Sequence, residues 1–182
     1  MLPNPPLVRC EIYWKNYRVT ECGRVFKIKR RTWIECTYDK YGRYTRVWLK
    51  NPLDKSRKNE YVHRLVAELF VKNPAPSTFD CVDHVDGDCK NNHFTNLRWL
   101  NHKLNTMWQT KAKGYSYLKR WKKYVARCCG KHIGYYKTKE EAHAVYKKYQ
   151  KEHFEASYKR YIEDDKRNSS DDSSDLQASQ IP

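Results

Sequence analysis

The spacing of apolar residues sets the strongest limit on what this chain can fold into. Over most of its 182 residues, apolar and aromatic side chains occur in short runs that alternate with polar ones, which is typical of β-strands. Only a few stretches show the spacing of an amphipathic helix, and each follows a group of strand-like runs. The pattern therefore predicts an α+β protein made of small antiparallel sheets with helices between and after them.

Residues 10–59 predict a small antiparallel sheet with a basic face. The runs YRVTECGRVFKIKR and WIECTYDKYGRYTRVWLK are rich in β-branched and aromatic residues, and Gly23 and Gly42 mark turns within them. A helix is expected next, with an apolar stripe formed by Val62, Leu65, Val66, Leu69 and Phe70. His63 lies off that stripe, which favours a packing or phosphate-facing role over that of a metal ligand.

The following segment predicts a strand, a polar loop, a second strand and a helix. FDCVDH and LRWL are the strands, and the loop between them has Gly87 at its turn. Asn101 is a good N-cap for a helix that continues through HKLNTMWQT.

Three more strands and a helix are expected beyond residue 111. The runs YSYLKR, KYVARCC and KHIGYY predict the strands, and TKEEAHAVYKKYQKEHF predicts the helix, which begins with a capping box of Thr138 and Glu141. From Glu163 on, the content of Ser, Asp and Gln rises and the apolar periodicity disappears, so we expect a disordered acidic tail.

The chain is strongly basic, with 37 Lys and Arg against 21 Asp and Glu and a net charge of +16. Residues 163–182 hold six of the acids and only two of the bases, a net charge of −4, so residues 1–162 carry +20. A field of this sign attracts polyanions, of which nucleic acid is the commonest. Ribosomal and membrane-surface proteins can share such a charge, so the charge indicates a class of partner and no activity.

The cysteines and the hydropathy indicate an intracellular protein. Seven Cys are present, an odd number without a CxxC pair, and no secretory signal precedes them. We therefore expect reduced thiols and neither a disulfide framework nor a cysteine zinc site. No apolar run approaches the length of a transmembrane helix, so no membrane partner is expected.

The stretch DHVDGDCKNNHFTN, residues 83–96, is acidic and rich in amides within this basic chain. Asp83 and His84 place a carboxylate and an imidazole at the end of a strand. A neutral His can accept a proton from water near neutral pH, and a hard cation such as Mg²⁺ prefers a few oxygen ligands from the protein. Asn105 lies about one turn into the next helix, where its amide oxygen could point back toward Asp83.

The remaining polar residues of this stretch have a structural interpretation. Short polar side chains in loops commonly bond to nearby backbone groups. We expect that role for Asp86, Asp88, Asn91 and Asn92, and we expect His93 to fill the loop.

The pattern D-H-x-D-G…N-N…N-L-R-W…N resembles the HNH endonucleases, specifically the homing type of phage and viral genes, with its ββα-metal finger. The spacing His84-x11-Asn96-x8-Asn105 is specific to that motif. The resemblance implies that His84 is the general base and that Asn96 orients its ring through backbone or side chain. It also implies that Asp83 and Asn105 bind a divalent metal, Mg²⁺ or Mn²⁺. Some relatives use His at the last position, which leaves His102 as an alternative, although the spacing favours Asn105.

Two flanking regions carry further resemblances. YRVTECGRVF and VHRLVAELFVKNP are similar to the segment that commonly precedes this module, and GYSYLKRWKKYVARCCGKHIGYYKTKEEAHAVY is similar to the DNA-binding domain of plant ethylene-response factors. A three-stranded sheet can lie in the major groove of double-stranded DNA. The basic and aromatic residues expected to contact DNA there are Lys111, Lys113, Tyr117, Lys119, Arg120, Trp121, Lys122, Lys123 and Arg127.

These interpretations predict a metal-dependent DNA endonuclease that nicks double-stranded DNA as a monomer or weak dimer and takes no small-molecule ligand. Two alternatives stay open, a catalytically inactive sequence-specific DNA-binding regulator and an RNA-binding or RNA-cleaving protein. The expected domains are a DNA-contacting β-rich segment (1–59), the HNH domain with its preceding helix (60–110), the ethylene-response-factor-like domain (111–160) and the acidic tail (161–182).

Overall fold

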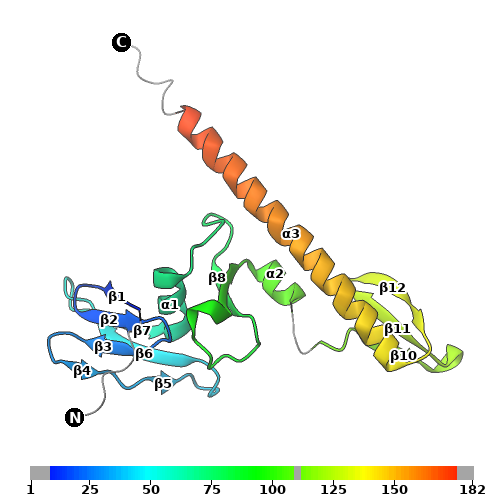
Figure 1. Cartoon of the computed structure of the whole chain (residues 1–182), viewed down its shortest axis with the longest axis horizontal. Coiled ribbons are helices and arrows are strands. Elements are labelled where there is room, and N and C mark those ends of the chain that lie inside the picture. The colour runs from blue at the N-terminus through cyan, green and yellow to red at the C-terminus, as the bar shows by residue number, and fades with distance from the viewer. Residues whose placement is uncertain (1–8, 109–111, 176–182) are drawn as a thin grey trace. The chain divides into compact units, whose positions relative to one another are not determined.

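The computed structural model describes residues 9–108 and 112–175 of the chain, with side chains up to residue 169 (Figure 1). The chain divides into two compact units. The first unit comprises Met1–Asn73 and Val82–Trp99, and the second comprises Pro74–Cys81 and Leu100–Pro182. The backbone therefore passes from one unit to the other three times, after residues 73, 81 and 99.

The N-terminal strands of the first unit form two antiparallel sheets rather than the single small sheet expected. One sheet has the order β1 (Cys10–Tyr13), β2 (Tyr17–Thr20), β3 (Val25–Lys27) and β4 (Thr32–Trp33). The other has the order β5 (Thr37–Tyr38), β6 (Thr45–Lys50) and β7 (Arg57–Tyr61). Side chains alternate along each strand, and the fully buried ones on β2, β3 and β6 are Val19, Val25, Val47 and Leu49.

Helix α1 (Val62–Phe70) begins directly after β7 and confirms the helical spacing seen in the sequence. Its stripe of Val62, Leu65 and Val66 is buried. The turn between β2 and β3 lies against this helix at Gly23, where a Cβ atom would come within 2.6 Å of Val62 Cγ1. Because the φ angle there is also +85°, only glycine suits the position.

A two-stranded antiparallel ribbon follows, formed by β8 (Cys81–His84) and β9 (Leu97–Leu100). The polar loop between them ends in a short 3₁₀ helix, η1 (Phe94–Asn96). Helix α2 (His102–Met107) comes next, and the Asn101 side chain accepts a hydrogen bond from Leu104 N at 2.9 Å, which confirms the expected N-cap. The strand–loop–strand–helix order of the sequence is thus present.

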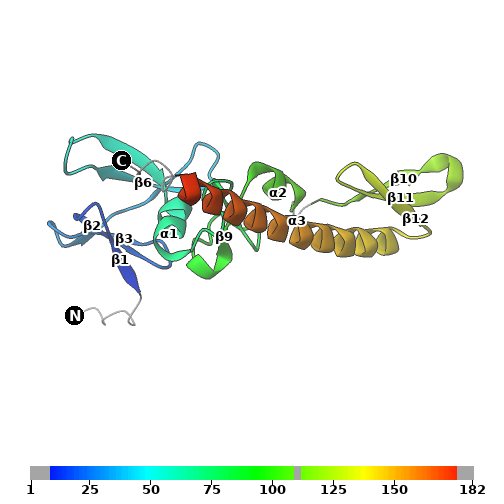
Figure 2. The same cartoon turned by 90° about the horizontal axis from the view of Figure 1, so that it is seen from above.

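The rest of the second unit is a three-stranded antiparallel sheet with a helix along one face (Figures 1 and 2). Its elements are β10 (Tyr115–Leu118), η2 (Lys119–Trp121), β11 (Lys123–Cys128), β12 (Lys131–Tyr136) and α3 (Lys139–Asp175). The capping box is confirmed, since Glu141 N donates to Thr138 Oγ1 and Thr138 N donates to the Glu141 carboxylate. Ala126 and Cys128 of the sheet pack against Ala142 and Tyr146 of α3.

Helix α3 is longer than the sequence indicated, because it continues to Asp175 through residues where a disordered tail was expected. The segment 74–81 packs on this part of the helix, where Phe79 stacks on Tyr158 with ring centroids 5.3 Å apart. Ser77 donates a hydrogen bond to Asp165, which is only 4% exposed. These contacts from a distant segment stabilise a helix that its own polar sequence does not predict.

Residues 176–182 of the expected tail lie outside the described residues. Even with α3 included, no helix in the described ranges has both the length and the apolar character that crossing a membrane requires.

Candidate functional site

The loop after β8 is built by the polar residues of the DHVDGDCKNNHFTN stretch. Val85 N donates to Asn96 O at 2.8 Å, which closes the loop, and Gly87 N donates to His84 O at 2.9 Å. Asp86 Oδ1 accepts from Asp88 N at 2.8 Å, and its Oδ2 accepts from Asn91 Nδ2 at 2.8 Å. These hydrogen bonds lower the pKa of the Asp86 carboxyl and confirm the loop-shaping role expected of the stretch.

Asn96 is buried at the base of this loop, and its amide group is fully used there. The Nδ2 atom donates to Asp86 Oδ1 and to Asn91 O, both at 2.9 Å, and the Oδ1 atom accepts from Asp86 N at 3.1 Å. Asn96 is therefore connected to His84 only indirectly, because its backbone O accepts a hydrogen bond from Val85, the residue that follows His84.

The His84 ring is held instead by Asn92. His84 is 5% exposed, and its Nε2 atom lies 3.3 Å from Asn92 Oδ1. An amide oxygen can only accept, so the proton of this bond sits on Nε2 and the lone pair of the ring is on Nδ1. Asn92 is tied in turn to β6, through a hydrogen bond from its Nδ2 to Thr45 Oγ1 at 3.4 Å. The sequence indicated only a loop-shaping role for Asn92.

A second imidazole lies against the first. The His63 ring centroid is 5.1 Å from that of His84, with the planes at 61°, and Tyr44 contacts both rings. Burial, followed by the proximity of His84, lowers the pKa of His63 to about 4. His63 is therefore neutral at neutral pH and adds no charge beside His84. The expected packing role of His63 is confirmed.

Asp83 is paired with an arginine that the sequence did not single out. Arg98 on β9 donates to Asp83 Oδ2 from Nε at 2.9 Å and from Nη2 at 2.7 Å. Both side chains are mostly buried, with exposed fractions of 16% for Asp83 and 19% for Arg98. Both of these bonds converge on the Oδ2 atom of Asp83. The pairing of β8 with β9 brings Asp83 and Arg98 together. This contact could be predicted only if the register of the two strands were known.

Asn105 and His102, the two candidates for the last motif position, lie on α2 in the second unit. The backbone N of Asn105 donates to Asn101 O at 3.0 Å. Among the described residues, no cluster of three or more His, Cys, Asp or Glu side chains could hold a metal ion. The expected pair, one carboxylate and one amide, supplies oxygen donors of the kind that suit Mg²⁺, which keeps most of its water ligands.

The residues expected to contact DNA divide between the two faces of the β10–β12 sheet. Tyr117 pairs with Tyr124 and so lies on the face that packs against α3. Lys123 and Arg127 are exposed, and the alternation along β11 puts them on the opposite face, the outer face. Tyr135 pairs with Val125 and lies on that face as well. The strand register thus separates Tyr117 from Arg127.

The other expected contacts lie at the ends of this sheet. Lys119, Arg120 and Trp121 form η2, and the Trp121 ring is 52% exposed and 5.3 Å from the Tyr135 ring. Lys122 ends that turn with a φ of 47°, and Lys113 precedes β10. Lys111 lies outside the described residues.

Two named relatives show what half of this chain is similar to. The uncharacterized HNH endonuclease L245 of Acanthamoeba polyphaga mimivirus is 37% identical over 90 residues, which are 50% of this chain and 26% of that protein. The DNA endonuclease I-HmuI of Bacillus phage SP01 is 37% identical over 93 residues, 51% of each protein. Half of this chain is similar to HNH endonucleases.

A solved structure also matches about half of the chain. A solved structure on DNA binding and cleavage by the HNH homing endonuclease I-HmuI has 35% identity and a TM-score of 0.45, and covers 52% of each chain. No protein-family model matches the chain. It spans about a quarter to about half of the length of the relatives named above. The resemblance to ethylene-response factors, on which the domain predicted over residues 111–160 rests, stays a prediction.

Proposed function

We propose that this protein is an HNH-type DNA endonuclease that hydrolyses phosphodiester bonds with His84 as general base. The observation that carries the proposal is the fixed His84 ring, whose Nε2 atom is bonded to Asn92 and whose Nδ1 atom carries the lone pair. A buried imidazole that is held through one nitrogen can take a proton from water with the other. The similarity of half the chain to HNH endonucleases supports the same activity.

In the proposed reaction, His84 Nδ1 accepts a proton from the water that attacks phosphorus. Asp83, through Oδ1, and Asn105 would hold a divalent cation, Mg²⁺ or Mn²⁺, which when bound stabilises charge on the phosphate and the departing 3′ oxygen. Arg98 orients the Asp83 carboxylate by its two bonds to Oδ2. Asn96 holds the loop that carries these groups.

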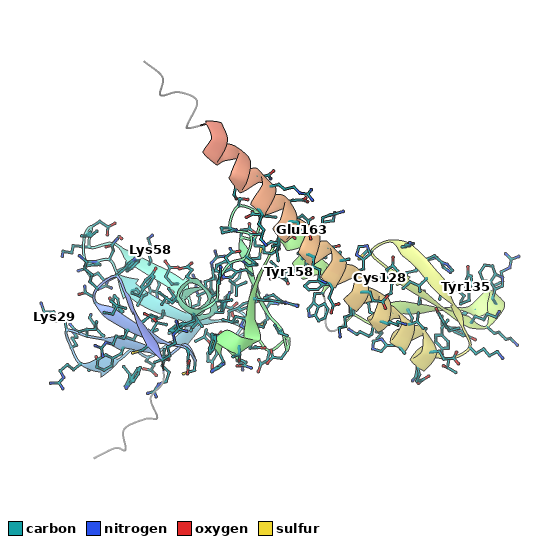
Figure 3. The ribbon with its side chains drawn as sticks, turned by 45° about the horizontal axis from the view of Figure 1, so that its top comes forward. Lys29, Lys58, Cys128, Tyr135, Tyr158 and Glu163 are labelled. Carbon is teal, nitrogen blue, oxygen red and sulfur yellow. The ribbon has the colours of Figure 1, made fainter. Side chains whose placement is uncertain are left out.

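Double-stranded DNA is the proposed substrate, bound outside the motif by the N-terminal sheets and by the β10–β12 sheet. Exposed cations support this, among them Lys58 on β7 (Figure 3). Arg127 on β11 is exposed as well. A chain with a single HNH motif cuts one strand at a time, so we infer nicking by a monomer or weak dimer.

A second candidate function is a DNA-binding regulator that keeps the fold without cleaving. The Asp83–Arg98 ion pair favours it, because a carboxylate already neutralised by a guanidinium attracts a cation less strongly.

A supercoiled-plasmid assay separates the two functions. Wild type, His84→Ala and the control His93→Ala, which removes an imidazole from the same loop, are each incubated with Mg²⁺, Mn²⁺ or EDTA. Open-circular product that needs the metal, is lost in His84→Ala and persists in His93→Ala supports the nuclease. Binding to plasmid and genomic DNA without any metal-dependent nick supports the regulator, and cutting by His84→Ala at the wild-type rate refutes the assignment of the base.

A further inference from the structure

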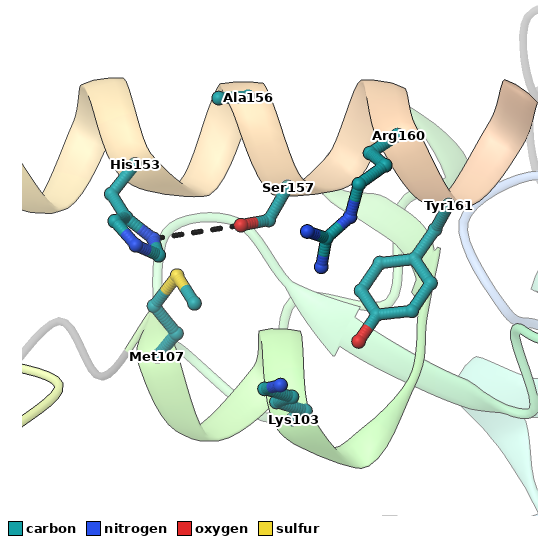
Figure 4. Close-up of a pocket in the computed structure, with 7 residues that line it drawn as sticks. All are labelled: Lys103, Met107, His153, Ala156, Ser157, Arg160 and Tyr161. Atoms are coloured by element: carbon teal, nitrogen blue, oxygen red, sulfur yellow. Dashed lines mark hydrogen bonds between the residues drawn. The ribbon is translucent and has the colours of Figure 1, made fainter.

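A cavity of about 310 Å³ lies between α2 and α3 within the second unit (Figure 4). We call it the α2–α3 groove. Lys103 of α2 forms one wall, and His153, Ser157, Arg160 and Tyr161 of α3 form the other. It lies beyond the four motif residues, and no step of the proposed mechanism uses it.

The walls of the groove are firmly held together. Gln150 Nε2 of α3 donates to Met107 O at the end of α2, at 2.7 Å. The Trp108 and Phe154 rings pack with centroids 4.7 Å apart, and Leu104 of α2 is fully buried. The side chains that face the groove are therefore presented from two helices in a fixed relation.

The groove gathers positive charge from both of its walls. Lys103 and Arg160 project into it from opposite walls (Figure 4), and neither forms an ion pair within the described part of the chain. His153 Nδ1 lies 3.5 Å from the Ser157 hydroxyl on the same wall. No carboxylate lines the groove. Two cations facing each other across a small cavity repel unless an anion lies between them.

The donors suit a phosphate group in particular. A guanidinium, an ammonium and the Ser157 and Tyr161 hydroxyls are the side-chain groups that contact phosphate oxygens in protein–DNA complexes. Because residues 1–162 carry +20, the polyanion that the whole chain attracts can supply that phosphate.

We propose that the α2–α3 groove binds a backbone phosphate of duplex DNA. The inference rests on the proposed function in one respect, that DNA is the partner. Lys103 is two residues before Asn105 on the same short helix. A phosphate held by Lys103 and Arg160 would therefore fix α2, and with it the proposed metal ligand Asn105, on the DNA backbone.

The test compares two double variants that remove the same charge. Lys103→Gln with Arg160→Gln empties the groove of its cations, whereas Lys151→Gln with Lys159→Gln removes two exposed cations of α3 that do not line it. Binding of a fluorescein-labelled duplex of arbitrary sequence is measured by anisotropy in EDTA, over a series of salt concentrations. Thermal unfolding checks that both variants fold.

The groove variant should bind more weakly at every sequence tested, and its slope of log affinity against log salt should fall by about one, because one phosphate contact is lost. The control should keep a slope near that of wild type. Ser157→Glu, which retains both cations but places a carboxylate between them, should weaken binding as well. Equal slopes for the two double variants would overturn the proposal. A competition experiment gives a second way to overturn it. If poly-L-glutamate displaces the labelled duplex as effectively as unlabelled DNA of equal charge does, the groove binds any acidic polymer and not a phosphate in particular.

Plasmid cutting by the same proteins separates this inference from the proposed function. If wild type nicks DNA while the two slopes are equal, the groove assignment fails and the nuclease stands. If no metal-dependent nick forms while the slope falls only in the groove variant, the phosphate site stands and the nuclease fails.

Discussion

At the scale of single residues, the imidazole of His84 is fixed by side chains from three separate parts of the chain. Asn92 bonds it from the loop, His63 packs on it from α1, and Tyr44 contacts it from the turn before β6. An imidazole that is held from several directions keeps one orientation, which would favour the proton transfer proposed for His84.

Removing the amide that holds the ring should lower the rate of cleavage. We expect Asn92→Ala to reduce plasmid nicking by about tenfold to a hundredfold, with little change in the affinity for duplex DNA. Asn91→Ala is the control, because Asn91 bonds Asp86 in the same loop and does not touch His84. An equal loss of nicking in both variants would show that the loop as a whole, and not the orientation of the ring, sets the rate.

Buried His63 should make the fold sensitive to acid. Folding lowers the pKa of the His63 imidazole from the ordinary 6.5 to about 4. Between pH 6.5 and pH 4, therefore, His63 binds a proton in the unfolded chain but not in the folded protein. The free energy of unfolding should therefore fall as pH drops from 6.5 toward 4, by up to about 3 kcal/mol. Urea unfolding at pH 7 and pH 4.5 measures this, and His63→Phe should show a smaller difference between the two. An unchanged difference in the variant would rule out His63 as the cause.

At the scale of elements, the packing of α3 on its sheet depends on how the chain enters β10. Gly114 has a φ of +71°, and a Cβ atom there would come within 2.0 Å of Tyr146 Cγ, a buried residue of α3. The aromatic ring thus occupies the space that a side chain at position 114 would need.

Gly114→Ala should therefore destabilise the second unit for two reasons, the strain of an alanine at positive φ and the overlap of its methyl group with Tyr146. Gly130→Ala is a matched control, because its φ is +77° but nothing lies within 4 Å of the added methyl group. We expect a loss of about 1 kcal/mol for Gly130→Ala and at least twice that for Gly114→Ala, measured by urea unfolding. Equal losses would mean that Tyr146 moves aside without cost.

Much of this element structure could be predicted, because it follows from local rules. The cap at Asn101, the box at Thr138 and the stripe of α1 each depend on residues within two turns of one another. The lengthening of α3 could not be predicted, since it relies on Phe79 and Ser77, which are distant in sequence. In the same way the motif indicated Asp83 and His84, whereas their partners Arg98 and Asn92 follow from strand register and loop geometry.

At the scale of the whole molecule, the charge is unevenly distributed along the chain. Residues 1–162 carry +20, and the acidic residues after them lower the total to +16. A segment of opposite sign competes with DNA for the basic surface, and salt screens that competition.

Deleting residues 170–182 should raise the affinity for non-specific duplex DNA at low salt. The deletion removes Asp171, Asp172 and Asp175 while keeping Asp165, which bonds Ser77. We expect a gain of a few-fold that disappears as salt rises, measured by anisotropy. Replacing the same three residues by Asn controls for the loss of length and should give the same gain. If neither variant binds duplex DNA more tightly than wild type, this segment does not compete with DNA.

The backbone passes between the two units three times, and this limits where the chain can be cut into fragments or joined to another protein. A fragment that stops at residue 99 keeps Phe79 without the α3 rings against which it stacks, and one that starts at residue 100 keeps α3 without Phe79. Exchange of either unit at a single crossover point would leave the other with an uncovered apolar side chain. A recombinant gene can therefore inherit this pair of units intact only by taking residues 74–81 together with α3.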